Sequence, residues 1–338
     1  MKRETLAGLH LVRGLCALLV MLYHYLHITK VGTFHAMGTY AVYIFFALSG
    51  YTLYYVYGEE PLTEAGLRKF FLARIFRIAP LYWLVIAYQM LVGAWTPVRQ
   101  AEYALNLTGL FGLATPGETS ATPAGWSIGI EVVFYLLFPA LVLLRSTRSL
   151  AVVFVVSLVV NALFVHATFA DKALAANNWA SYTQPATFLC YFVGGMLAAK
   201  VTLERGWLAS SANRPWAILA ALALIGLICA VPIALGYDRQ QTLDGLLPKA
   251  LVLASILVVA LAALSRLDGL PERIGTFLGN ISYATYLFHL IVWGQVAALL
   301  PDASPGVKAA LSASITIGLA WLSQRYFEGW ARRLQYRF

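Results

Sequence analysis

Long apolar runs dominate the chain, and short polar segments separate them. Each run is about 20 residues long, which is the length of helix that crosses the hydrocarbon core of a bilayer. We therefore expect an all-α fold, a polytopic bundle of transmembrane helices. The pattern predicts ten spans, at residues 6–28, 36–57, 71–93, 125–144, 150–168, 185–201, 215–235, 246–264, 277–299 and 307–324.

The composition agrees with a membrane protein. Hydrophobic residues make up 60% of the chain and charged residues only 12%, whereas soluble domains carry about a quarter charged residues. No segment between the spans is long enough for a second domain, so we expect a single transmembrane domain, 1–338, with no appended soluble domain. The longest such segment, 94–124, is expected to hold a short interfacial helix around 102–113. The start resembles a signal peptide, but Arg13 and His24 interrupt its apolar run, so we interpret it as a retained first helix.

The positive charges predict the orientation of the chain. With the N-terminus in the cytosol, 17 of the 24 Lys and Arg residues fall on the cytosolic side, six fall on the opposite side and Arg13 lies within the first span. Cytosolic loops carry such an excess, so both termini are expected in the cytosol. The net charge of +9 therefore reflects topology, and we expect no nucleic-acid partner. The three cysteines lie in apolar runs without ligand or disulfide spacing, so we expect no metal site.

Ionisable side chains inside spans are costly and usually mark function. Arg13 and His24 are 11 residues apart in the first span, which places them on one helix face. Glu131 is the carboxylate that lies well inside an apolar run, at about the depth of His24. Each also has a plainer interpretation: His24 would donate an interhelical hydrogen bond, Arg13 would extend toward the headgroups, and Glu131 would only pair with Arg13 or orient a helix.

Two further groups extend this set of polar residues. His289 falls near mid-membrane and shares a helix face with Ser282 and Tyr286, so the polar faces of three spans are expected to converge. Arg74 and Arg77 lie one turn apart at the cytosolic mouth, where an arginine pair can grip phosphates. The plainer interpretations are a packed histidine and ordinary cytosolic positive charge.

These residues belong to six short motifs that follow one another along the chain. The motifs are RGLCALLVMLYH (13–24), YIFFALSGY (43–51), FFLARIFRIAPLY (70–82), WSIGIEVVFY (126–135), FVGGMLAA (192–199) and LGNISYATYLFH (278–289). In this order they resemble the acyltransferase-3 family of integral membrane O-acyltransferases, many of which O-acetylate bacterial surface glycans. The resemblance covers nearly the whole chain. Val132, Val133 and Phe288 depart from the residues common in the family, but none of them is assigned a role.

The resemblance implies that an acyl group, by default acetyl, moves from cytosolic acyl-CoA to a hydroxyl of a cell-surface or lipid-linked glycan. Acyl-CoA would be a co-substrate, and no permanently bound cofactor is expected. The partners would be acyl-CoA, a glycan or lipid-linked saccharide and the lipid bilayer, in a multi-pass protein of the bacterial inner membrane.

The chemistry assigns roles to the polar residues. A hydroxyl attacks a thioester only when a base takes its proton, and a histidine suits that task near neutral pH. His24 is the predicted base, and Glu131 or His289 would orient it or stabilise its charged form. Arg74 and Arg77, together with Arg13, would bind the phosphates of CoA. Direct transfer and a covalent acyl-histidine both remain open.

Two other classes of protein share some of these features. A secondary transporter or exporter would use buried His, Glu and Arg as a proton relay, although the two halves show no convincing repeat. A glycan-sensing membrane protein would need no chemistry at all. Transfer of label from acetyl-CoA to a sugar distinguishes the enzyme from both.

Overall fold

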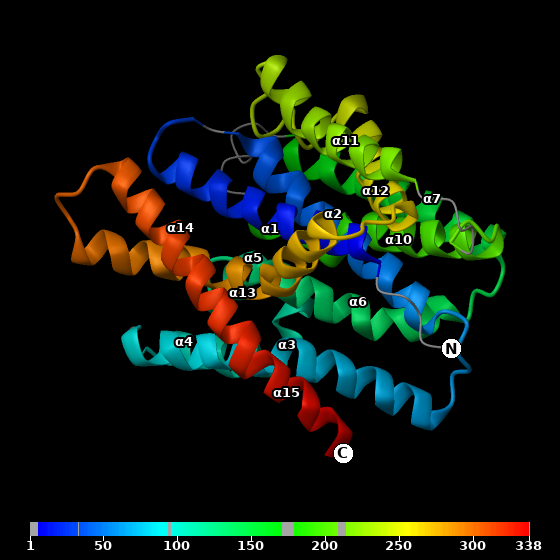
Figure 1. Cartoon of the computed structure of the whole chain (residues 1–338), viewed down its shortest axis with the longest axis horizontal. Coiled ribbons are helices and arrows are strands. Elements are labelled where there is room, and N and C mark those ends of the chain that lie inside the picture. The colour runs from blue at the N-terminus through cyan, green and yellow to red at the C-terminus, as the bar shows by residue number, and fades with distance from the viewer. Residues whose placement is uncertain (1–5, 33, 94–95, 171–178, 209–213, 338) are drawn as a thin grey trace. The chain divides into compact units, whose positions relative to one another are not determined.

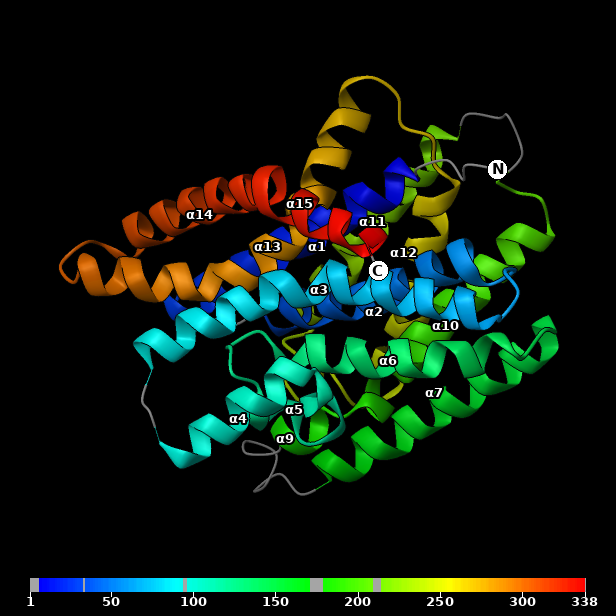
Figure 2. The same cartoon turned by 90° about the horizontal axis from the view of Figure 1, so that it is seen from below.

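The computed structural model describes residues 6–32, 34–93, 96–170, 179–208 and 214–337. Within these ranges every regular element is helical, which confirms the predicted all-α fold (Figures 1 and 2). The elements are α1 (Ala7–Ile28), α2 (His35–Tyr57), α3 (Glu64–Val92), α4 (Pro97–Thr108), η1 (Leu110–Leu113), α5 (Pro116–Thr119), α6 (Trp126–Val142), α7 (Thr147–Phe169), α9 (Trp179–Tyr182), α10 (Pro185–Glu204), α11 (Pro215–Ala234), α12 (Leu246–Leu264), α13 (Leu270–Leu299), α14 (Pro305–Leu322), η2 (Ser323–Glu328), α15 (Gly329–Leu334) and η3 (Gln335–Arg337).

Eight helical segments of the described residues are long and apolar enough to cross a membrane. They include α1, α2, α3, α7, α11 and α12, together with the segments that contain α10 and α14. The helix α6 is shorter, at 17 residues, and α13 is long enough but too polar to be counted with them. Each of the ten predicted spans is thus a helix, while the count of ten membrane crossings and the cytosolic termini stay predictions.

The helix α4 shows how local signals set the bounds of an element. Its first turn is capped by the Thr96 side chain, which accepts a hydrogen bond from the backbone N–H of Arg99, and Pro97 follows the cap directly. It ends at Gly109, whose φ of 74° lies in the left-handed region that glycine favours. A short helix was expected around 102–113, so the element exists but begins five residues earlier and stops at the glycine.

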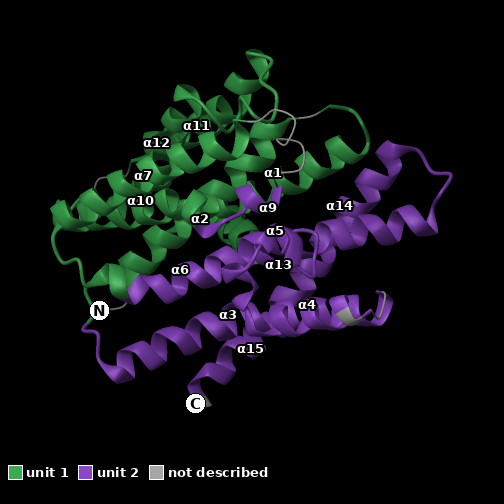
Figure 3. Cartoon of the chain, turned by 180° about the vertical axis from the view of Figure 1, so that it is seen from behind, with its two compact units in different colours: residues 1–60, 140–178, 186–280 green, residues 61–139, 179–185, 281–338 purple. Residues whose placement is uncertain are grey.

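The chain divides into two compact units, which Figure 3 shows in two colours. Unit 1 comprises Met1–Glu60, Ala140–Asn178 and Ala186–Asn280, and unit 2 comprises Pro61–Pro139, Trp179–Pro185 and Ile281–Phe338. Each unit is therefore built from three separate stretches of the chain. The prediction of a single transmembrane domain stays a prediction.

Two motif glycines bring α2 and α10 of unit 1 into backbone contact. A Cβ atom at Gly50 would lie 1.9 Å from the carbonyl oxygen of Phe192, and one at Gly195 would lie 2.1 Å from the carbonyl oxygen of Ala47. No real side chain tolerates such distances, so the two helices approach as closely as they do because both positions are glycine. The glycines of the second and fifth motifs therefore serve helix packing.

Replacing Gly195 by alanine is expected to destabilise the protein by about 1–3 kcal/mol, because the added methyl group forces two backbones apart. Thermal unfolding of the purified protein in detergent measures the effect. Gly226→Ala is the matched control, since a Cβ there meets nothing within 4 Å. Equal losses in both variants would contradict the proposed contact.

Candidate active site

A cluster of arginines lies on unit 2 where η2 and α15 pack against α3. Arg74 and Arg77 are both half-buried on α3, one turn apart, as the sequence predicts. Arg77 interacts electrostatically with Arg74, with Arg332 of α15 and with Glu131 and Tyr135 of α6. We call Arg74, Arg77 and Arg332 the basic cluster. Within unit 2, two of the predicted phosphate-binding arginines, Arg74 and Arg77, therefore belong to one group with the predicted active-site carboxylate.

Glu131 is connected to this cluster through a tyrosine. The Tyr135 hydroxyl, one turn further along α6, donates a hydrogen bond to Oε1 of Glu131 at 2.5 Å. The guanidinium carbon of Arg74 lies 5.8 Å from the centre of the Tyr135 ring, within the range of a cation–π contact. Tyr135 is only 5% exposed. Its ring and hydroxyl thus join the carboxylate of α6 to the cation of α3.

A second carboxylate, Glu328, was not among the predicted site residues. The last span was predicted to end at 324, but the helix continues through a π-helical turn at Ser323–Glu328, a feature common at functional sites. Glu328 is 4% exposed and accepts a hydrogen bond from Arg332 at 3.0 Å. The sequence did offer a signal, since Glu328 and Arg332 are opposite charges spaced four residues apart, as in a helical ion pair. This pair lay beyond the end of the apolar run.

The polar face of α13 in unit 2 meets α6 and α3. The hydroxyls of Tyr286 and Ser127 are 2.7 Å apart, and the Tyr283 hydroxyl donates to the carbonyl of Ile78 at 2.9 Å. His289 is fully buried, and its Nδ1 lies 2.7 Å from the carbonyl oxygen of Tyr286. Because a carbonyl only accepts, Nδ1 carries the hydrogen and Nε2 carries the lone pair. The helix also places Ser282, which is 3% exposed, on the predicted face.

Arg13 and His24 both lie on α1 in unit 1, and both are half-buried. The helix is continuous between them, so they share the predicted face. Nδ1 of His24 lies 3.0 Å from the carbonyl oxygen of Val20, which again places the hydrogen on Nδ1 and the lone pair on Nε2. His24 belongs to unit 1 whereas Glu131 and His289 belong to unit 2, and the convergence of the three side chains stays a prediction.

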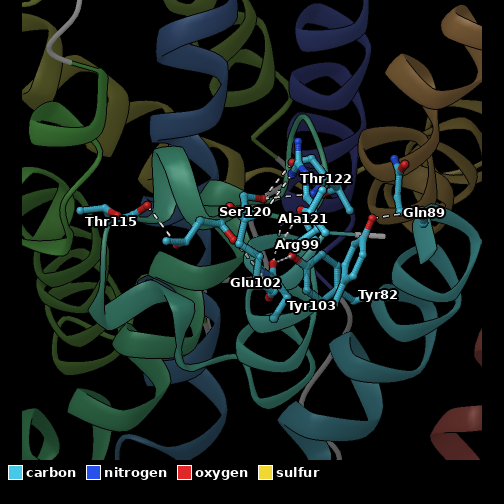
Figure 4. Close-up of polar contacts among 12 residues, drawn as sticks. Tyr82, Gln89, Arg99, Glu102, Tyr103, Thr115, Ser120, Ala121 and Thr122 are labelled. Carbon is cyan, nitrogen blue, oxygen red and sulfur yellow. Dashed lines mark hydrogen bonds and ion pairs between the residues drawn. The ribbon is translucent and has the colours of Figure 1, made fainter. Parts of the chain in front are cut away.

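A cavity of about 370 Å³ lies in unit 2 at the far end of α3 from the basic cluster. The C-terminal end of α3, the helices α4 and α5, the segment that follows α5 and the first residue of α6 contribute its lining. Figure 4 shows several of these residues, among them Gln89, Arg99 and Tyr103, with their polar contacts. It is lined by Gln89, Gly93, Arg99, Tyr103, Gly117, Ser120, Ala121, Thr122, Pro123 and Trp126. We call it the α3–α6 pocket. None of its residues had a predicted role.

One buried amide holds the walls of this pocket together. The Asn106 side chain of α4 is fully buried, and its oxygen accepts hydrogen bonds from the Tyr82 hydroxyl at 2.6 Å and from the backbone N–H of Ala121 at 3.0 Å. Its nitrogen donates to the carbonyls of Glu102 at 2.7 Å and Thr119 at 2.6 Å. All four hydrogen-bonding positions of the amide are therefore used. Asn106 fixes the loop before α6 to both α3 and α4.

These features define the chain as a multi-pass membrane protein with buried ionisable side chains, a class that comprises membrane-embedded enzymes and transporters. The model of the acyltransferase-3 family, described as an acyltransferase domain, matches residues 6–325. The chain belongs to this family, as the six motifs indicate, and it is a membrane acyltransferase. The family assignment thus favours the enzyme over the transporter.

Two curated relatives align with most of the chain. The exopolysaccharide production protein ExoZ of Rhizobium meliloti (strain 1021) is 25% identical over 299 residues, which cover 86% of this chain and 87% of ExoZ. ORF330 of Acidianus two-tailed virus, which is named as a candidate acetyltransferase, is 24% identical over 284 residues, or 83% of this chain and 81% of ORF330. No solved structure is significantly similar to the chain.

Proposed function

We propose that the protein transfers an acyl group, by default acetyl, from cytosolic acyl-CoA to a hydroxyl of a cell-surface or lipid-linked glycan at the bacterial inner membrane. The observation that carries this proposal is that α3 bears two different sites in unit 2, the basic cluster and the α3–α6 pocket. Arg77 of the basic cluster and Gln89 of the α3–α6 pocket are 12 residues apart on this helix, which corresponds to about 18 Å along its axis. A phosphate-bearing donor and a sugar acceptor would thus have separate places about three turns apart along one spanning helix.

The basic cluster suits the donor. Arginine binds phosphate through paired, charge-assisted hydrogen bonds, and Arg74, Arg77 and Arg332 supply three guanidinium groups in one part of unit 2. Arg13 would add a fourth from α1. The excess of positive charge on this side of the predicted topology favours a cytosolic location, where acyl-CoA is available. Acyl-CoA acts here as a co-substrate, and thioester transfer needs no permanently bound cofactor.

His24 is the proposed base. Its Nε2 takes the proton of the sugar hydroxyl while the hydroxyl oxygen attacks the thioester carbonyl; the C–O bond forms, the C–S bond breaks, and the CoA thiolate leaves with the proton that His24 returns. Glu131 or His289 would orient the imidazole or stabilise its charged form. An acyl-histidine intermediate would use the same Nε2 as nucleophile. The names of ExoZ and ORF330 support a glycan acceptor and an acetyl group respectively.

Labelled acetyl-CoA tests the proposal directly. Membranes from an expressing strain are expected to move the acetyl label onto a glycan or lipid-linked sugar, from which mild base releases it as acetate, because the product is an ester. Membranes from a deletion strain should not do so. Label that reaches no saccharide, with either acetyl-CoA or longer acyl-CoA thioesters as donor, would refute the proposed donor and acceptor.

The double variant Arg74→Ala, Arg77→Ala tests the donor site. We expect its KM for acetyl-CoA to rise at least about 100-fold, because hydrogen bonds to charged groups are worth about 1.5–3 kcal/mol each and the variant loses at least two of them. Steady-state transfer at varied acetyl-CoA measures it. Lys69→Ala removes an exposed cation from the same helix and serves as the control. An unchanged KM in the double variant would show that the phosphates bind elsewhere.

A further inference from the structure

We infer that the α3–α6 pocket binds a neutral sugar residue of the acceptor glycan. This inference rests on the proposed function. It adds where the acceptor binds and that the bound sugar residue carries no charge. The cavity of about 370 Å³ falls within the range of about 300–1,000 Å³ that is typical of small-ligand sites. All residues that line it belong to unit 2.

The chemistry of the lining suits a pyranose ring. Sugars present an apolar face of C–H groups, which packs on aromatic rings, and a rim of hydroxyls, which needs donors and acceptors. Trp126 supplies the aromatic surface, and its ring is held edge-on against Trp179 of α9 at 5.3 Å between ring centres. Gln89, Tyr103 and Ser120 add an amide, a phenol and a hydroxyl. Among the described residues no group bonds to the half-buried Gln89 amide, so it is available to a ligand.

The charge of the pocket argues against an anionic ligand. Arg99 is the charged side chain among the residues that line the cavity. Its guanidinium is already paired with the Glu102 carboxylate at 2.9 Å, one turn along α4. This pair leaves the pocket polar but without a free positive charge, unlike the basic cluster. Phosphates and uronic acids are therefore disfavoured, and a neutral sugar is favoured.

The walls of the pocket are closely built. A Cβ atom at Gly93 would lie 2.7 Å from the Tyr103 hydroxyl, and one at Gly117 would lie 2.2 Å from Oγ1 of Thr183. Both glycines let neighbouring segments approach closely, and the Tyr103 hydroxyl is fixed by its hydrogen bond to the carbonyl of Gln89 at 3.1 Å. The Tyr103 hydroxyl is thus preorganised, which lowers the cost of ligand binding.

Binding to the purified full-length protein tests the inference without acyl-CoA. The probes are maltose, cellobiose, mannobiose and digalacturonic acid, and affinities are measured by saturation-transfer NMR and calorimetry. We expect at least one neutral disaccharide to bind more tightly than digalacturonic acid. Trp126→Ala should weaken that binding by at least about tenfold, and Gln89→Leu by about three- to tenfold. Gln100→Ala, exposed on α4 and outside the lining, should bind like the unmodified protein.

The affinity for acetyl-CoA, measured in the same preparations, separates a local effect from misfolding. The affinity for acetyl-CoA should change less than about threefold in Trp126→Ala, because the basic cluster and the α3–α6 pocket share no residue and mutations at separate sites have nearly independent effects. Three results would each overturn the pocket assignment. They are a preference for digalacturonic acid, disaccharide binding that is unchanged in Trp126→Ala and Gln89→Leu, and no binding of any disaccharide. If labelled membranes still acetylate a glycan, such a result leaves the proposed function standing. Absence of transfer from both acetyl-CoA and longer acyl-CoA thioesters would instead remove the proposed function.

Discussion

Replacing His24 by alanine is expected to lower acyl transfer by a factor of about 10²–10⁴, the usual contribution of a general base. The reason is the tautomer that α1 imposes. The carbonyl of Val20 accepts the hydrogen of Nδ1, so Nε2 carries the lone pair that can take a proton or an acyl group. Ester content of the surface glycan in a deletion strain complemented with each variant measures the effect, with protein level checked by immunoblot.

Two further variants make this test specific. His24→Gln keeps a polar side chain of similar reach but has no basic nitrogen, so we expect it to be as inactive as His24→Ala. His27→Ala removes an exposed histidine one turn further along α1, whose ring stacks on Tyr23, and it should retain activity. Normal glycan acylation in His24→Gln would show that the imidazole serves only as a hydrogen-bonding group.

The positions of the helices could be predicted because length and hydropathy suffice for elements that cross a bilayer. Their ends depend on caps, and these were less well predicted. The helix α3 begins at Glu64, seven residues before the predicted start of its span, because the Thr63 side chain caps it by accepting from the N–H of Gly66. A polar first turn outside the apolar run is invisible to a hydropathy pattern, although the capping residue itself is readable.

The candidate site was only partly predictable, for a different reason. Arg74, Arg77 and Glu131 were accessible from the sequence because an ionisable side chain within or beside an apolar run is unusual. Glu328 and Arg332 escaped because they follow the end of that run and reach the site through a π-helical turn. The linear pattern contains no sign of such a turn.

The motifs also proved to contain residues with different tasks. Glu131 and Tyr135 of the fourth motif connect to the basic cluster, and Trp126 of the same motif lines the pocket. Gly50 and Gly195, by contrast, allow two helices of unit 1 to touch. Membership of a motif therefore does not by itself place a residue at the site. Contacts seen in the structure are needed to distinguish motif residues that serve packing from those that serve chemistry.

Asn106 illustrates the part of the site that no local pattern predicts, and its loss is expected to have the largest effect on stability. An asparagine in a short polar helix is unremarkable in sequence, yet here one amide joins α3, α4 and the loop before α6. Asn106→Leu leaves the Tyr82 hydroxyl, the Ala121 N–H and the Thr119 carbonyl without this partner. At about 1–3 kcal/mol for each buried group left unsatisfied, we expect a loss of about 3–5 kcal/mol in the free energy of unfolding.

Denaturant unfolding in detergent measures this loss, and Tyr82→Phe is the matched control. It removes only one of the four hydrogen bonds of Asn106, so it should cost about 1 kcal/mol. Asn106→Asp keeps the accepting oxygen but places its second carboxylate oxygen against the carbonyls of Glu102 and Thr119 in a buried site, so it should cost at least as much as Asn106→Leu. Because the loop that Asn106 holds also forms the wall of the α3–α6 pocket, disaccharide binding should decline in the same order. A loss in Asn106→Leu no greater than in Tyr82→Phe would mean that the loop is held by other contacts and that the amide is dispensable.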